Sequence, residues 1–97
     1  MTQEQQRQAL AKAFPNKLQE KQHLWFWTNK HHIWITCLAN DPLRDLNLMF
    51  ELEKSLDWKQ MGEYCTRLDE MDDNSHGIHT TAAHRAKALI ATLKLKP

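Results

Sequence analysis

Apolar residues recur at the spacing of an amphipathic helix in four segments of the chain. The first segment ends at Pro15, because proline cannot continue a helix. The second begins at Asp41-Pro42, where aspartate suits the N-cap and proline the first helical position. The third begins at Asp57 and the last at Thr80 or Thr81, all good N-cap residues. The sequence therefore predicts helices over residues 2–14 and 42 to about 56. A third helix follows Asp57 and ends in the acidic stretch 69–74, and the last helix follows Thr80 or Thr81 with an apolar stripe that runs to Leu93.

One segment has a different pattern, because Trp, Phe, Ile and Thr dominate residues 23–37. These residue types favour strands, and Asn29-Lys30 between the two apolar runs favours a tight turn. We predict a hairpin with strands at 23–28 and 31–38. Alternation places Trp25 and Trp27 on one face of the first strand. Both faces are largely apolar, so helices or another chain must cover them.

The predicted order is α-β-β-α-α-α, a β-hairpin layered with four helices in an α+β fold. Ninety-seven residues suffice for one core, so we expect a single domain over residues 1–97. The composition, 41% hydrophobic and 26% charged, is globular rather than disordered. No apolar run approaches the ~20 residues of a membrane span, and the opening residues lack a signal-peptide core. We therefore expect a cytoplasmic protein with no membrane partner.

Charge is segregated along the chain, although the formal net charge is only +1. Residues 1–36 carry five basic and two acidic groups. Residues 37–75 carry four basic and ten acidic groups, and residues 76–97 carry four basic groups and no acidic group. The near-neutral total argues against a polybasic nucleic-acid binder and a wholly acidic DNA mimic. Segments of opposite sign either neutralise each other in the fold or reserve one face for a charged partner.

Two stretches and the amino terminus carry a family resemblance. The stretches are DLNLMFELEK at 45–54 and IHTTAAHRAKAL at 78–89, and the terminus is TQEQQRQA at 2–9. Together they resemble the phage ABA sandwich domain family of small tailed-phage and prophage proteins. Phe14-Pro15-Asn16 replaces the family's Gly-Trp, and Leu95-Lys96-Pro97 its aromatic ending. The resemblance implies a helix–sheet–helix fold and a phage or prophage origin, and it implies no reaction.

Candidate catalytic groups are few. Cys37 and Cys65 fall at core-like positions, where we expect inert free thiols. Glu53 lies inside the apolar arc of its helix, where it could serve as a desolvated acid. An ion pair with a basic group such as Arg85 is the favoured interpretation. We expect no enzyme activity.

Histidines could hold a metal after the third helix. His76 and His79, with Asp72 and Asp73 before them and His84 after them, would form a workable ligand set. The spacing is generic and no cysteine lies nearby, so a polar loop is favoured. We expect no bound metal and no cofactor.

Binding residues have the stronger argument. The hairpin carries tryptophans beside basic groups, and exposed tryptophan is a preferred interface anchor. A second charged surface would lie in the acidic loop after the third helix. The candidate contact residues are Trp25, Trp27, Lys30, His31, Asp69, Glu70, Asp72 and Asp73.

These observations predict a non-catalytic phage or prophage accessory protein. It would bind a host protein or protein–nucleic-acid complex, such as a defence nuclease complex, and inhibit it in an anti-CRISPR-like manner. The alternative is a small single-stranded nucleic-acid-binding or regulatory protein that uses the basic hairpin. A second copy of the chain is a further candidate partner, since edge strands pair readily.

Overall fold

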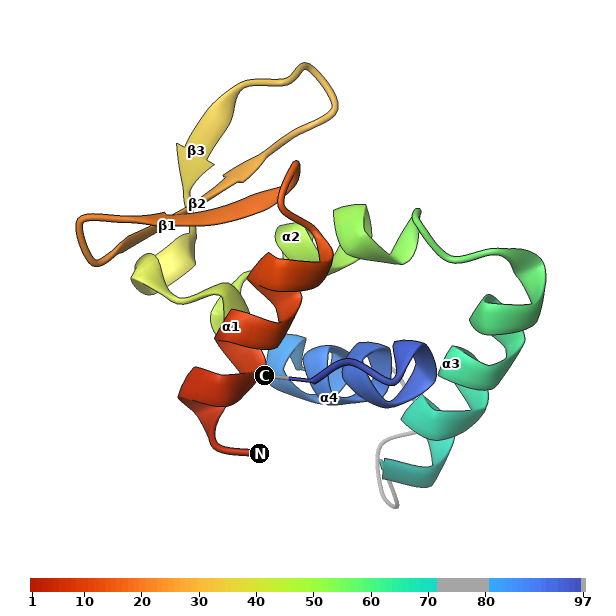
Figure 1. Ribbon diagram of the computed structural model, residues 1–97. Helices are drawn as coiled ribbons and strands as arrows, with labels where there is room; N and C mark the ends of the chain where they lie inside the picture. Colours follow the sequence, from red (N-terminus) through yellow and green to blue (C-terminus); the bar gives the residue numbers. More distant parts are fainter. Residues whose placement is uncertain (72–80, 97) are drawn as a thin grey trace.

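Three short strands pack against four helices in the computed structural model, which describes residues 1–71 and 81–96 (Figure 1). The α+β class and the single core are confirmed, and the order is α-β-β-β-α-α-α. The elements are α1 (Gln3–Ala13), β1 (Leu18–Lys21), β2 (Leu24–Thr28), β3 (Trp34–Thr36), α2 (Leu46–Glu53), α3 (Trp58–Met71) and α4 (Ala82–Leu93).

The sheet is antiparallel, in the order β1-β2-β3, and its first strand was not predicted. β1 has the sequence LQEK and contributes a single apolar residue, Leu18, to the core. With one apolar residue in four, β1 lacks the alternation of apolar and polar residues that predicts a strand. The sequence pattern therefore did not predict it. Gln22 and His23 connect β1 to β2 in a two-residue turn, both with positive φ.

The last strand is shorter than the predicted 31–38, because a five-residue loop occupies 29–33. The Asn29 side-chain oxygen accepts hydrogen bonds from the backbone N–H groups of His31 and Ile33. His32 takes the left-handed conformation, with φ of 61°. Asn29 thus closes the turn as predicted, but through its side chain and over a longer loop.

The predicted helix at 42–56 is broken at Asp45. Asp41 caps a 3-10 turn over Pro42–Arg44, where its carboxylate accepts the Leu43 N–H. Asp45 then leaves the helical conformation and caps α2 by accepting the Leu48 N–H. Its second oxygen accepts the Leu38 N–H from the end of the sheet.

The other predicted helix starts are confirmed. Thr2 caps α1 and exchanges reciprocal hydrogen bonds with Gln5. Asp57 and Gln60 form the same reciprocal arrangement at the start of α3. Thr81 caps α4.

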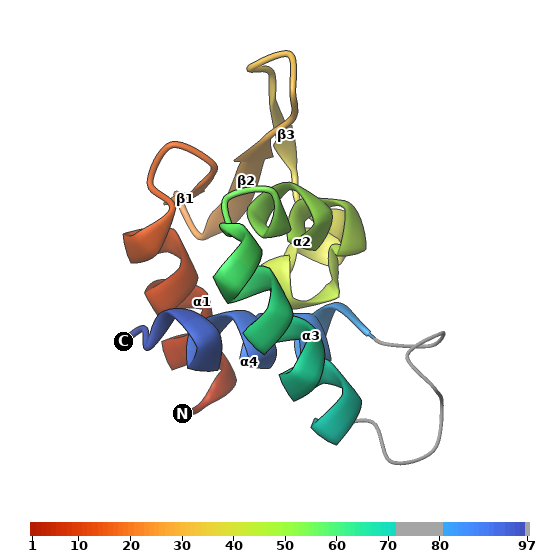
Figure 2. The ribbon, with the colours of Figure 1, turned by 90° about the vertical axis from the view of Figure 1, so that its right-hand side faces the viewer.

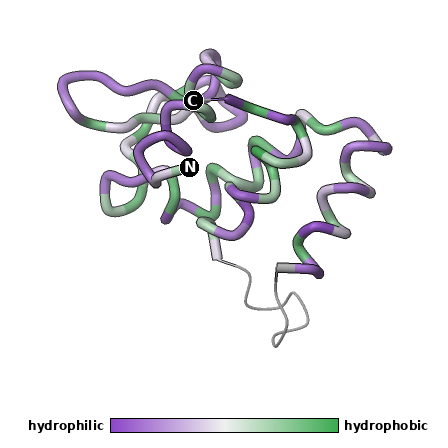
Figure 3. The backbone as a smooth tube through the Cα atoms, turned by 60° about the horizontal axis from the view of Figure 1, so that its bottom comes forward, coloured by the Kyte–Doolittle hydropathy of each residue, from purple (hydrophilic) through white to green (hydrophobic). Residues whose placement is uncertain are grey.

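Helix α4 runs through the centre of the helical layer, where Ala86, Ala88 and Leu89 are fully buried. Alanines allow close approach, and α1, α2 and α3 all pack on this helix. Hydrophobic and hydrophilic residues alternate along α3 (Figure 3), because only one side of it faces α4. None of the helices in the described part of the chain has the length and hydrophobicity that a membrane crossing requires.

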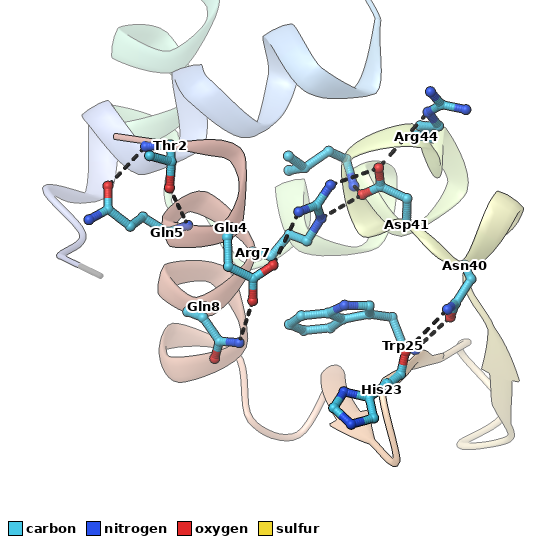
Figure 4. A network of polar contacts seen from close by, with 11 residues as sticks. Thr2, Glu4, Gln5, Arg7, Gln8, His23, Trp25, Asn40, Asp41 and Arg44 are labelled. Atoms are coloured by element: carbon cyan, nitrogen blue, oxygen red, sulfur yellow. Dashed lines mark hydrogen bonds and ion pairs between the residues drawn. The ribbon is translucent and has the colours of Figure 1, made fainter.

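Polar contacts fasten the sheet and α1 to the segment that follows β3 (Figure 4). Arg7 of α1 donates to both carboxylate oxygens of Asp41, at 2.9 and 3.0 Å. This bidentate pair lowers the pKa of Asp41. Asn40 accepts the Trp25 N–H and donates to the His23 carbonyl. The Asn40 side chain alone therefore bonds two backbone groups at the start of β2.

Helices cover one face of the sheet. Leu18, Trp25 and Trp27 point from that face into the core. On the opposite face, Leu24 is 44% exposed and Trp34 is 42% exposed. The helix–sheet–helix layering that the resemblance implies is therefore not seen in residues 1–71 and 81–96. The β2–β3 hairpin projects away from the helices in two perpendicular views (Figures 1 and 2).

Candidate binding surface on the outer face of the sheet

The uncovered face of the sheet, here called the outer face, takes its side chains from alternate positions of all three strands. The register pairs Gln19 with Phe26, Lys21 with Leu24, and Thr28 with Trp34. Residues paired directly across two antiparallel strands share a face. Alternation therefore brings these side chains to the side opposite Trp25 and Trp27.

A hollow of about 330 Å³ lies on the outer face. Phe26 and Trp34 supply its aromatic surfaces, and Gln19 and Lys21 its polar groups. Phe26 is half-buried and Trp34 is exposed, so both rings are held by the sheet and remain open to solvent. Two aromatic groups beside an amide and an ammonium can stack a planar group and bind an anion attached to it.

One basic residue lines this hollow, and two more lie in the loop of the same hairpin. Lys21 lies in it, and Lys30 and His31 are exposed in the hairpin loop beyond Trp34. Among the described residues, neither lysine forms a salt bridge. Lys17, at the other end of β1, approaches Glu51 at 3.8 Å. Lys21 is therefore available for a negatively charged partner, whereas Lys30 lies close enough to Glu51 to help lower the pKa of that carboxyl group.

The predicted tryptophan contacts must be corrected. Trp25 and Trp27 are only 5% and 6% exposed, so neither can anchor a partner on this fold. Exposed tryptophan does occur, as we expected, but at Trp34 and at Trp58, which is 84% exposed at the start of α3. Lys30 and His31 keep the predicted exposure, and Trp34 takes the anchoring position beside them.

The predicted acidic contact residues do not join this surface. Asp69 and Glu70 are exposed near the end of α3, and Asp72 and Asp73 lie outside the described residues. The end of α3 and the hairpin loop lie at opposite ends of the molecule (Figures 1 and 2). Asp69 and Glu70 therefore lie apart from the basic hairpin, on a separate surface as expected.

Glu53 forms the ion pair that we favoured. Its carboxylate pairs with Arg85 of α4 and accepts a hydrogen bond from the Tyr64 hydroxyl of α3. Burial, followed by the contact with Glu53, raises the pKa of Tyr64. The Arg85 guanidinium also lies 5.1 Å from the centre of the Phe50 ring. Glu53 is thus held by two partners and joins three helices, which is a structural role.

The two cysteines differ more than predicted. Cys37 is buried, and desolvation raises the pKa of its thiol to about 12. Cys65 is exposed on α3, so the expectation that it lies in the core is wrong. Both are free thiols, as expected. Cys37 would not form a thiolate nucleophile near neutral pH.

The proposed metal ligands fall largely outside the described residues, which include neither His76 nor His79. Within 1–71 and 81–96, no group of three His, Cys, Asp or Glu side chains is placed to hold a metal ion. His84 lies in the first turn of α4.

The outer face could have been identified from the sequence if β1 had been recognised. Leu18, the one apolar residue of β1, pairs with Trp27. That pairing assigns the face of Trp25 and Trp27 to the core and leaves Phe26 and Trp34 outside.

Comparison of the chain with known protein families, with curated proteins and with solved structures finds no match in any of the three.

Proposed function

We propose that this chain is a non-catalytic binding protein that docks its outer face on a negatively charged host macromolecule and inhibits it by covering that surface. The observation that carries the proposal is the Phe26–Trp34 hollow, which is also lined by Lys21. Aromatic anchors surrounded by charge are typical of protein contact sites.

A host protein–nucleic-acid complex offers a surface of the required charge. A defence nuclease bound to its nucleic acid is one such partner, which would make the chain an anti-CRISPR-like phage or prophage protein. The sequence resemblance to phage ABA sandwich domains supports the choice of a bacterial host. The commitment of Glu53 to an ion pair and the burial of Cys37 support a role without catalysis.

The test is a tagged pull-down from bacterial lysate, with and without nuclease treatment, followed by an activity assay on any captured complex. We expect Trp34→Ala to reduce capture at least about tenfold, as for an interface anchor. Trp58→Ala is the matched control, because it removes a more exposed tryptophan at a distant site. The charge reversals Lys21→Glu and Lys30→Glu should act like Trp34→Ala, and Lys59→Glu with Lys87→Glu should not.

Equal capture by Trp34→Ala and Trp58→Ala would place the contact elsewhere. Capture without loss of the partner's activity would remove inhibition from the proposal and leave binding alone.

A second candidate function is single-stranded nucleic-acid binding, and the same hollow favours it. Bases stack on exposed aromatic side chains beside lysines without regard to sequence. Fluorescence anisotropy with a labelled oligonucleotide at two salt concentrations distinguishes the two functions. Salt-sensitive binding that Trp34→Ala abolishes, with no protein partner after nuclease treatment, would favour this candidate.

A further inference from the structure

The free edge of β3 lacks the features that usually protect an edge strand. Among residues 1–71 and 81–96, β3 pairs with β2 on one side only. Residues 33–40, IWITCLAN, contain no charged residue, no proline and no glycine. Natural edge strands normally carry lysine, proline or a bulge, because unpaired backbone groups invite another strand. β3 is protected by its shortness alone.

The hydrogen-bond pattern identifies which backbone groups face the free edge. Cys37 donates its N–H to the Trp25 carbonyl, and Asn29 donates its N–H to the Ile33 carbonyl. In an antiparallel pair, alternate residues turn their backbone groups to the same neighbour. The backbone N–H and carbonyl groups of three residues therefore point towards β2, namely those of Ile33, Ile35 and Cys37. Trp34 and Thr36 turn their N–H and carbonyl groups outward.

This arrangement suits a two-fold axis through Ile35. If two copies of β3 meet antiparallel with Ile35 opposite Ile35, each Trp34 lies opposite Thr36 of the second copy. Those two pairs would exchange four backbone hydrogen bonds. The central Ile35 pair would be of the non-hydrogen-bonded type, in which side chains approach most closely. The edge is thus complementary to itself in both hydrogen bonding and apolar character.

Apolar surface beside the edge is large enough for a modest dimer. Ile35, Leu38 and Leu46 supply much of the apolar lining of one hollow of about 280 Å³ next to β3, which Thr36, Asp45 and Asn47 also line. With Ile33 and Trp34, these three apolar side chains are between 37% and 65% exposed. That exposure amounts to about 500 Å² of apolar surface per copy, taking 150–250 Å² for a whole large side chain. A standard interface buries about 800 Å² per partner, of which somewhat more than half is apolar.

We propose that the chain forms a symmetric homodimer in which β3 pairs antiparallel with β3 of a second copy about Ile35. The two sheets then join into one six-stranded sheet, β1-β2-β3-β3-β2-β1. The pairing brings the two outer faces side by side, so a partner that spans both can bind bivalently. The dimer does not rest on the proposed function, because it depends on the free backbone of β3 and not on the charge of Lys21 and Lys30, although Trp34 belongs to both surfaces.

The test is the mass in solution, by light scattering on a sizing column, of Thr36→Pro and a matched control. Proline at 36 removes an N–H that faces the free edge and leaves the β2–β3 bonds in place. Glu20→Pro is the control. Thr28 donates its N–H to Lys17, so by the same alternation Glu20 faces the free edge of β1. We expect wild type and Glu20→Pro near twice 11.5 kDa at high concentration, and Thr36→Pro at the monomer mass.

A chain that stays monomeric at every concentration, or a dimer that survives Thr36→Pro, would overturn the proposal. Amide hydrogen exchange on the unaltered chain decides the case if Thr36→Pro fails to fold. When the protein concentration is raised, the backbone amides of Trp34 and Thr36 should exchange at least tenfold more slowly. The exchange rate of the Glu20 amide should not change. Protection that appears only when a different protein is added would assign the edge to that partner's strand instead. Lys21→Glu with Lys30→Glu should remain dimeric even where partner binding is lost.

Discussion

At the scale of single residues, Glu53 shows how a charge is accommodated between helices. Three helices meet at its carboxylate, which Arg85 and Tyr64 both contact. The side chains of Glu53 and Arg85 are 16% and 19% exposed, so solvent screens the pair only partly. Removing one partner of such a pair leaves the other desolvated and unpaired, which costs more than the pair itself contributes.

Glu53→Gln should therefore lower the free energy of unfolding by about 1.5–3 kcal/mol, the range for a lost hydrogen bond to a charged group. Glu63→Gln makes the same chemical change in an exposed pair with Arg67. That control should change stability by less than about 0.5 kcal/mol. Urea unfolding of both variants measures the difference. Similar values for the two would show that Glu53 is as well solvated as Glu63.

The thiols of Cys37 and Cys65 should differ in their reactivity towards alkylating reagents, because Cys37 is buried and Cys65 is exposed. Burial raises the pKa of Cys37 to about 12, and Cys65 is open to solvent. At about pH 8 an alkylating reagent attacks the thiolate, so the folded protein should gain one group, at Cys65. In denaturant it should gain two. Mass spectrometry counts the groups, and rapid double labelling of the folded protein would contradict the burial of Cys37.

At the scale of elements, the backbone conformation of the β1–β2 turn is unfavourable for its residues. Gln22 and His23 have φ of 54° and 65°, the conformation of a two-residue hairpin turn that Asn-Gly adopts at lower cost. The turn matters because it brings Leu18 and Trp27 into register.

Replacing Gln22 by Asn and His23 by Gly should raise the free energy of unfolding by about 0.5–1 kcal/mol, because the left-handed conformation no longer strains a side chain. The Asn40 contact with residue 23 uses a backbone carbonyl and survives the change. Lys30→Gly is the control, since φ there is not positive. Urea unfolding compares the two. A gain in both, or in neither, would mean that the turn carries no strain.

The elements also show where sequence patterns are informative. Caps at Thr2, Asp57 and Thr81 follow from local hydrogen-bonding chemistry and were predictable. The break at Asp45 was not, because the apolar spacing continues through it while the backbone does not. The β1 strand was missed because only Leu18 of its four residues is buried.

At the scale of the whole molecule, alternation along β2 established which side chains share a face but not which face is inside. Both faces of the predicted hairpin are largely apolar, and in the described residues the helices cover one of them. The choice between the faces depends on long-range packing of Trp25 and Trp27 against the helices, which no local pattern contains. Two of the predicted contact residues, Trp25 and Trp27, therefore lie on the covered side of the hairpin.

The order of pairing in the sheet has a consequence for how the chain folds. Each strand pairs with its neighbour in sequence, so the sheet closes only short loops. Helix α1, in contrast, packs on α4 from the far end of the chain. Closing a longer loop costs more entropy, and contacts between distant segments slow folding. The meander should therefore form early, and the joining of the first and last helices should complete the fold.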